Sequence, residues 1–332
     1  MSTISTSASP GLFPVASRVA STSSLVAMLA VLVLGAVPGL LDTGVVWVVL
    51  AAGLLIGLPH GAVDHLVPEW LLGRRLPGPQ AVAGLVAYVA VAAGFFGLLR
   101  VAPLPSALVF LAVSAAHFGA GDVEFHALRR GVTPRYRMLA VAAFGLPTVA
   151  LPIALHAEQV EPVLTALAPQ LAALATPQVR GVLLVATLLA AAVTGWRALN
   201  AGDVRVAQDL VVLVLVFAVA PPLAAFAVYF GFWHAARHMG RLLSLDPRNA
   251  HDLANERLGR PLWRFARLAA PPTAASLIVL AGLWWGAGGA QGLVSAHLGL
   301  LAALTMPHVA VVSWLDRTGR LARDRELPEV RA

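Results

Sequence analysis

The sequence predicts an all-α, polytopic transmembrane helical bundle of about ten spans (eight to ten). Of the 332 residues, 59% are hydrophobic and only 12% are charged, whereas soluble globular domains carry about 25% charged residues. Several apolar runs reach the roughly 20 residues that a helix needs to cross a bilayer. Backbone groups in a bilayer must pair internally, and the period-2 pattern of a β-barrel is absent, so the spans are predicted to be helices.

The apolar runs define the predicted spans in chain order. The first run is too long for the core of a signal peptide, so we expect a retained helix. Proline disrupts helices, and we place a sharp turn at Pro221-Pro222, with one long kinked helix as the alternative. The predicted spans are 24–41, 44–71, 80–99, 104–125, 138–155, 180–198, 206–220, 223–240, 268–287 and 291–314.

Three domains follow from this map. Residues 1–23, rich in Ser and Thr, are predicted to be a flexible N-terminal segment, 24–315 the transmembrane domain and 316–332 a cytoplasmic Arg-rich tail. The segment 155–179 is expected to be the longest external loop. The segment 241–267 is expected to be the largest cytoplasmic loop, and part of it suits an interfacial helix.

The basic charge fits a membrane topology. All 23 basic residues are arginines, and the net charge is +7. With both termini in the cytoplasm, every arginine except Arg100 and Arg180 falls on the cytoplasmic side, as the positive-inside rule requires. We therefore expect a lipid bilayer and no nucleic acid as the partner. The absence of cysteine excludes disulfides, cysteine-ligated zinc and iron–sulfur clusters.

Histidines occur inside the predicted spans in four compact motifs. Ionisable groups at membrane depth are costly and mark functional sites, and neutral imidazole is the commonest ligand of transition metals. The motif histidines all lie on spans that run inward, within roughly 9 Å of one level along the membrane normal. This pattern predicts a buried metal centre in the cytoplasmic half. The motifs are Pro59-His60-Gly61-Ala62-Val63-Asp64-His65, His117-Phe118-Gly119-Ala120-Gly121-Asp122, Trp233-His234-Ala235-Ala236-Arg237-His238 and Pro307-His308.

Spacing suggests roles for the first and third motifs. His234 and His238 are four residues apart and share one helix face, as ligand pairs do, although two interhelical hydrogen bonds would give the same pattern. His60 is predicted to be a ligand, with Asp64 accepting its second N–H. His65 is either a fifth ligand, an outer hydrogen-bonding group or a bystander. Arg237 either reaches the cytoplasmic interface or pairs with a carboxylate.

The other motif residues leave more alternatives open. His117 is predicted to be a ligand, and Asp122 either orients a ligand or caps its helix near the interface. His308 is either a fifth ligand, an outer group or a packing residue. We expect His297 to be structural. Three further histidines are expected in solvated loops: His126, His156 and His251.

The ligand set indicates the metal. Four imidazoles without a carboxylate suit Fe(II), with copper or zinc less favoured. Iron with an open position can bind O2, and an oxygen site in a membrane requires a lipophilic substrate. Aromatic residues near the motifs either line a pocket for a flat apolar molecule or only pack and anchor helices: Trp70, Phe118, Tyr229, Phe230, Phe232 and Trp233.

In order and spacing, the four motifs resemble the Brp/Blh family of membrane β-carotene 15,15′-dioxygenases, over roughly residues 25–315. The resemblance implies an Fe(II)- and O2-dependent enzyme that cleaves the central double bond of β-carotene to two molecules of all-trans-retinal. It implies a microbial rhodopsin as the downstream acceptor of retinal. Carried over motif by motif, the iron ligands would be His60, His117, His234 and His238.

Three other functions remain as alternatives. A di-iron desaturase or hydroxylase would use histidine boxes, but the chain has no His-His pair. A non-enzymatic b-type cytochrome would use span histidines as axial haem ligands. A proton-coupled transporter would use His60, Asp64 and Arg237 as a relay and would need no tightly bound metal.

Overall fold

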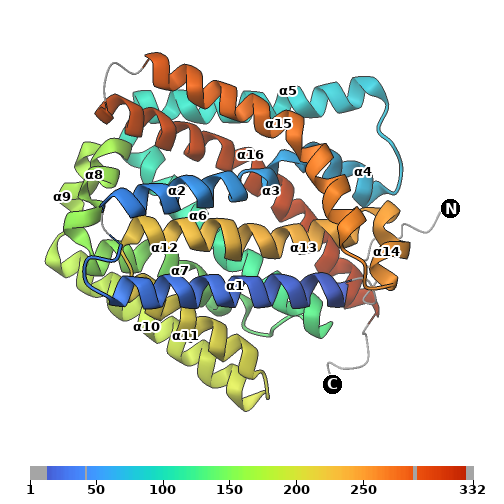
Figure 1. The fold of residues 1–332 in the computed structure, drawn as a ribbon, viewed down its shortest axis with the longest axis horizontal. Helices are drawn as coiled ribbons and strands as arrows, with labels where there is room; N and C mark the ends of the chain where they lie inside the picture. Colours follow the sequence, from blue (N-terminus) through green and yellow to red (C-terminus); the bar gives the residue numbers. More distant parts are fainter. Residues whose placement is uncertain (1–12, 42, 287–289, 327–332) are drawn as a thin grey trace.

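A computed structural model describes residues 13–41, 43–286 and 290–326, and within these ranges every regular element is helical (Figure 1). The prediction of an all-α fold is confirmed. The elements are α1 (Phe13–Ala36), α2 (Thr43–Gly57), α3 (Pro59–Ala62), η1 (Asp64–Leu66), α4 (Val67–Leu72), α5 (Gly78–Val101), α6 (Pro103–Arg130), α7 (Arg137–Leu155), α8 (Ala157–Leu167), α9 (Pro169–Leu174), α10 (Pro177–Asn200), α11 (Val204–Val219), α12 (Pro222–Val228), η2 (Tyr229–Ala235), α13 (Ala236–Leu245), η3 (Pro247–Asn249), α14 (Ala250–Ala254), α15 (Gly259–Gly286) and α16 (Ala290–Glu326).

Eight helices of the described residues are long and apolar enough to cross a membrane, judged by length and composition. They lie within Phe13–Ala36, Gly44–Leu72, Gly78–Val101, Pro103–Arg130, Arg137–Leu155, Pro177–Asn200, Gly259–Gly282 and Leu298–Arg323. Two further predicted spans are helical but are not among the eight. The helix α11 has 16 residues, and the continuous helix 222–245 carries two arginines and two histidines. The chain is therefore a multi-pass membrane protein, and Pro221-Pro222 is a turn between two helices.

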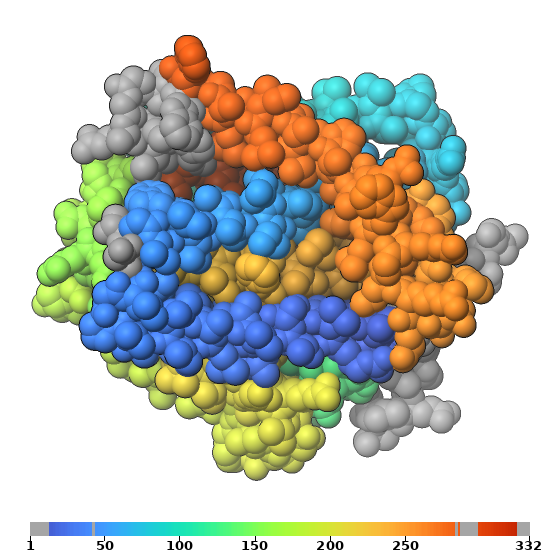
Figure 2. Space-filling view, in the orientation of Figure 1, coloured from blue at the N-terminus to red at the C-terminus, as the bar shows by residue number. Residues whose placement is uncertain are grey.

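The helix formed by α12, η2 and α13 runs through the middle of the bundle, beside α1 and α2 (Figure 1). In the space-filling view it is visible only as a narrow strip between those two helices (Figure 2). Its residues contribute to the main hydrophobic cluster, which includes the fully buried Tyr229 and Trp233. This central position explains how a segment with four ionisable side chains can lie inside the bundle.

Several helices extend beyond their predicted boundaries. The helix α1 begins at Phe13 rather than near residue 24. The helix α6 continues to Arg130, so the expectation that His126 lies in a solvated loop is wrong: it is buried in that helix. The helix α16 continues to Glu326 and so includes residues assigned to the tail. The side chain of His297 lies outside the described part of the chain.

Glycine allows two helix pairs to approach closely. A Cβ atom built on Gly119 would lie 1.9 Å from the carbonyl oxygen of Val141, and one built on Gly145 would lie 1.9 Å from that of Ala115. The helices α6 and α7 therefore touch through their backbones. On the other side of the bundle, a Cβ atom on Gly53 would lie 2.2 Å from the carbonyl oxygen of Ala227. The helix α2 therefore touches the central helix through its backbone as well.

Candidate metal centre

Five histidines from four separate segments meet inside the bundle. Each side chain belongs to a residue no more than 7% exposed. The ring of His60 lies 5.2 Å from that of His234 and 4.9 Å from that of His308, measured between centroids. The ring of His117 lies 4.9 Å from His234 and 5.0 Å from His308, and His238 lies 5.6 Å from His308. These five histidines therefore lie close together, whereas their level in the membrane stays a prediction.

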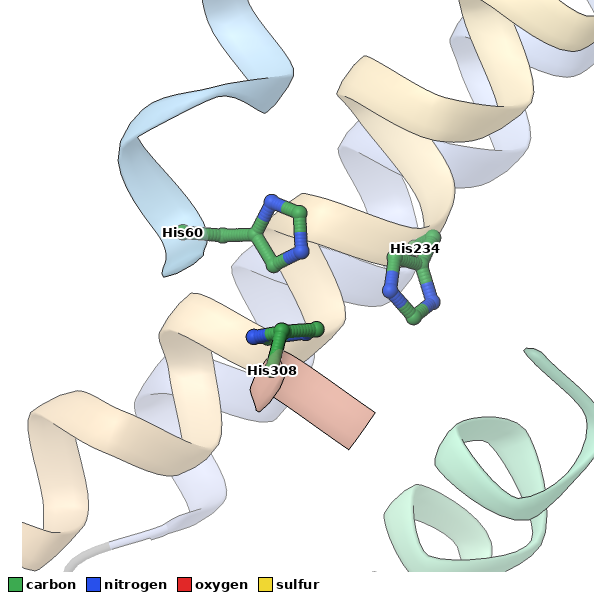
Figure 3. A group of neighbouring side chains, drawn as sticks. All are labelled: His60, His234 and His308. Carbon is green, nitrogen blue, oxygen red and sulfur yellow. The ribbon is translucent and has the colours of Figure 1, made fainter. Parts of the chain in front are cut away.

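Three of these histidines form a group with metal-binding geometry. One ring nitrogen each from His60, His234 and His308 lie within 4.8 Å of one another, and the three rings point toward a shared space (Figure 3). Metal–imidazole bonds are about 2.0–2.1 Å, so two ligand nitrogens can be at most roughly 4.2 Å apart. Three nitrogens bound to one metal ion cannot all be more than roughly 3.6 Å from one another, so the rings would move closer together on binding.

The ring nitrogens themselves indicate a missing partner. The Nε2 atoms of His117, His234, His238 and His308 are buried and have no hydrogen-bond partner. A buried polar atom left unpaired costs about 1–3 kcal/mol. Four such imidazole nitrogens, buried close together and without a protein partner, fit a metal ion that accepts nitrogen ligands.

Hydrogen bonds at Nδ1 orient two of the rings. Nδ1 of His308 lies 2.8 Å from Oδ2 of Asp64, and the hydroxyl of Tyr88 donates to the same oxygen at 3.1 Å. Nδ1 of His60 lies 2.5 Å from the carbonyl oxygen of Gly57. A carboxylate and a carbonyl only accept, so both histidines carry their proton on Nδ1 and leave Nε2 free for a metal.

This arrangement corrects one prediction. Asp64 was expected to accept from His60, four residues earlier, but it accepts from His308 on α16. The reason is local: α2 ends at Gly57, and Pro59 and His60 begin a separate short helix, α3. The ring of His60 therefore bonds the carbonyl of Gly57, three residues before it.

His234 and His238 lie on the central helix. Their rings are nearly parallel, with 4° between the planes and 6.5 Å between the centroids. His234 belongs to η2, a π-helix of seven residues. Such π-turns widen a helix by one residue and often occur at functional sites. Nothing in the sequence pattern predicted this turn.

An ion-pair network lies beside this histidine pair. Asp122 accepts hydrogen bonds from Nε1 of Trp233 at 2.9 Å and from Nη1 of Arg237 at 2.8 Å. Nη2 of Arg237 lies 2.8 Å from Asp209, which is 3.1 Å from Nε2 of His126. Asp122 is eight residues before the end of α6, so the alternative that it caps the helix is wrong. Of the two alternatives for Arg237, pairing with carboxylates is confirmed.

Aromatic rings surround another side of the cluster. The ring centroid of Phe118 lies 4.9 Å from that of His234 and 5.3 Å from that of Tyr229. The ring centroid of Phe230 lies 5.4 Å from that of His60. Trp233 differs, because it holds Asp122 and stacks against the guanidinium of Arg237, whose central carbon is 3.5 Å from a ring centre.

The structure leaves one predicted site residue outside the cluster. His65 is exposed, and its Nδ1 lies 3.1 Å from the carbonyl oxygen of Ala62. This geometry does not support a role for His65 at the centre. Four residues that take part in the site or its ion pairs were not singled out from the sequence: Tyr88, Asp209, Arg241 and Asp316. The only sequence signal was their polarity within apolar segments.

Comparisons with known proteins give a family and several relatives. Residues 51–316 match the family model described as beta-carotene 15,15′-dioxygenase, a range that contains all five clustered histidines. A comparison with solved structures finds no match.

Three relatives have similar lengths to the chain. A protein of Halobacterium salinarum named probable beta-carotene 15,15′-dioxygenase Blh is 33% identical over 293 residues, covering 80% of this chain and 83% of the relative. A protein from an uncultured marine bacterium named beta-carotene 15,15′-dioxygenase is 26% identical, covering 82% and 94%. A second Halobacterium salinarum protein, named probable beta-carotene 15,15′-dioxygenase Brp, is 27% identical, covering 79% and 81%.

Proposed function

The chain belongs to the β-carotene 15,15′-dioxygenase family, and we propose that it cleaves the central double bond of β-carotene with O2. The products are two molecules of all-trans-retinal. It is a carotenoid-cleaving dioxygenase of the membrane. The observation that carries the proposal is the cluster of five buried imidazoles, four of which have an unpaired Nε2 atom.

The metal we propose is Fe(II), with His60, His117, His234 and His238 as ligands and His308 as a fifth imidazole. An all-nitrogen set of neutral ligands favours a transition metal over Mg²⁺ or Ca²⁺. The tight group of His60, His234 and His308 supports including His308 among the ligands. When bound, Fe(II) supplies the redox chemistry that lets O2 react with a closed-shell double bond.

The reaction places little demand on proton transfer. One C=C bond and the O–O bond break, and two C=O bonds form, so carbon is oxidised, oxygen is reduced and no proton is consumed. The work of the protein is therefore to position the substrates and to exclude water. The rings of Phe118, Tyr229 and Phe230 pack beside the imidazoles, and we propose that the central part of the polyene lies against them. Trp233 donates a hydrogen bond to Asp122 and is therefore proposed to orient the site rather than to contact the polyene.

Carotenoids dissolve in the bilayer, and the helices of this chain are apolar enough to cross one. We place the enzyme in the cell membrane, where β-carotene can diffuse to it laterally. Retinal released there is available to a microbial rhodopsin, the downstream acceptor that the family resemblance implies.

The test is expression in a bacterium that accumulates β-carotene, followed by liquid chromatography of the extracted pigments. We expect loss of β-carotene and appearance of retinal. The variants His234→Ala and His238→Ala should lose both retinal formation and iron retention, because each removes an imidazole from the cluster. His251→Ala is the control, since His251 is exposed in α14.

Each competing function predicts a different result. A b-type cytochrome would show a Soret absorption band and no retinal, and a transporter would hold no stoichiometric metal. A di-iron enzyme would contain two irons per chain rather than one. Full activity in either His→Ala variant would refute the proposed centre.

A further inference from the structure

The histidine cluster has a polar side that the proposed carotenoid chemistry does not use. A small cavity lies against the rings of His234 and His238, between the central helix and α6. Two arginines and a carboxylate face it. The lining residues are Gly121, Asp122, His234, Arg237, His238 and Arg241.

Arg241 is a lining residue of this cavity that has two unpaired hydrogen-bond donors. It is 5% exposed, and its Nη2 atom pairs with Oδ1 of Asp316 on α16. Its Nε and Nη1 atoms are buried without a partner, as is Nε of Arg237. Buried donors are almost always paired, and leaving a charged one unpaired costs more than a neutral one. The cavity therefore suits a small molecule that accepts hydrogen bonds.

The size of the cavity excludes the carotenoid. Its room is on the order of one water molecule. The space exists because residue 121 has no side chain: a Cβ atom built there would lie 3.6 Å from Cε1 of His234, in ordinary contact. A conjugated chain with ring ends cannot enter, and it would not solvate two guanidinium groups. The apolar face formed by Phe118 and Phe230 is the better place for it.

We propose that this cavity is the site of the oxygen co-substrate and that Arg241 is the residue that stabilises the negative charge that oxygen gains during the reaction. The assignment rests on the proposed function. The two substrates then occupy opposite sides of the cluster, with β-carotene on the aromatic side and O2 on the arginine side. O2 gains electrons from the double bond, and a fixed cation in a water-poor interior lowers the energy of that charge without moving a proton.

The position of Arg241 supports this role. It lies one turn beyond His238 on α13, and it lines the same cavity as His234 and His238. Its pairing with Asp316 fixes the guanidinium while leaving two nitrogens unpaired. A side chain held in this way is preorganised, because it need not reorient when charge develops.

The test fills the cavity and measures oxygen affinity separately from carotenoid affinity. Gly121→Ala adds one methyl group that meets no atom closer than 3.6 Å, so we expect a folded protein with unchanged iron content. The KM for O2 should rise roughly tenfold, the change that about 1.4 kcal/mol of lost binding produces, while the KM for β-carotene stays the same. Nitric oxide, a diatomic probe of Fe(II), should bind more weakly by a similar factor, measured by electron paramagnetic resonance.

Two further variants complete the design. Gly97→Ala makes the same change on α5, where no atom lies within 4 Å of the added Cβ, and should alter neither constant. Arg241→Lys keeps the charge opposite Asp316 but removes the unpaired guanidinium donors. It should lower kcat and nitric oxide affinity and leave the KM for β-carotene unchanged.

The outcomes separate this proposal from the proposed function. A protein that retains no Fe(II) refutes both. A protein that retains Fe(II) and cleaves β-carotene, but whose Gly121→Ala variant keeps the wild-type KM for O2 and nitric oxide affinity, overturns the oxygen site alone and leaves a structural water as the occupant. A rise in the KM for β-carotene without a change for O2 would place the carotenoid in this cavity and also contradict the assignment.

Discussion

His308 was not among the four ligands that the family resemblance implied, yet it is held at the histidine cluster by hydrogen bonds to other helices. Asp64 accepts one hydrogen bond from Tyr88 at 3.1 Å and one from His308 at 2.8 Å. These two bonds join three helical segments that are far apart in sequence. Such outer partners hold a ligating imidazole in one tautomer and one orientation. Tyr88 is notable because the rest of α5 is largely exposed and apolar.

Replacing Asp64 should therefore weaken metal binding without removing a ligand. Asp64→Asn keeps an acceptor for Nδ1 of His308 but removes the charge, and loss of such a partner typically costs 10–100-fold in metal affinity or activity. Iron retention during dialysis against a graded series of chelator concentrations measures the effect. Tyr88→Phe should act in the same direction and more weakly, because His308 keeps its carboxylate. Equal iron retention in the wild type and Asp64→Asn would show that His308 does not bind the metal.

At the residue scale, the sequence predicted which histidines come together but not which hydrogen bonds orient their rings. Apolar surroundings single out His60, His117, His234, His238 and His308, and these do meet. Partnership across helices cannot be derived from spacing, so Asp64 was assigned to His60 instead of His308. His126 was placed in a loop because the hydrophobic pattern of α6 fades toward its end, where buried ion pairs replace apolar packing.

At the scale of elements, close backbone contact positions His117. The helix α6 lies against α7 through Gly119 and Gly145, and Gly119 is two residues after His117. A side chain at this contact would push the two helices apart. The contact between α6 and α7 therefore determines both how these helices pack and where His117, a proposed ligand, lies.

Gly119→Ala should destabilise the protein and displace His117 together. The added Cβ atom would lie 1.9 Å from a backbone oxygen of α7, and backbone cannot rotate away as a side chain can. Overpacking of this kind costs about 1–3 kcal/mol or more. Thermal unfolding of the purified protein and its iron content should both fall. Gly181→Ala, which meets no atom within 4 Å, is the matched control, and equal losses in both variants would contradict the packing argument.

The long helices could be predicted from hydrophobicity, whereas their interruptions could not. Length and apolarity alone predict the runs that became α5, α6 and α7. The π-helix at 229–235 and the break between α2 and α3 have no signal in the hydrophobic pattern. The two elements touch, because the ring of Phe230 occupies the space that a side chain at residue 57 would need, 2.2 Å from a built Cβ atom.

At the scale of the whole molecule, buried ion pairs gather at one end of the bundle. Glu124 is 1% exposed and pairs with Arg320 at 2.9 Å and Arg323 at 2.5 Å. Arg241 pairs with Asp316, and Arg237 with Asp122 and Asp209. The pairs of Glu124 and Arg241 join α16 to α6 and α13, and the pairs of Arg237 join α13 to α6 and α11. The segment 316–332, predicted to be a cytoplasmic tail, thus contributes ion pairs that hold α16 against the helices of the site.

The orientation of the protein in the membrane can be predicted from the ends of its helices. The start of α1 and the end of α16 lie at the same end of the bundle as α14 (Figure 1), and this end holds the arginine-rich connections. The positive-inside rule then predicts that both termini are cytoplasmic and that the histidine cluster faces that side. Green fluorescent protein fused to the C-terminus should fluoresce. Alkaline phosphatase fused after Ala168, at the end of α8, should be active, because it would lie outside the cell. The reverse pattern would place the ion pairs and the arginine side of the cluster toward the exterior. It would contradict the predicted orientation, and the positive-inside rule would no longer account for the arginines at this end.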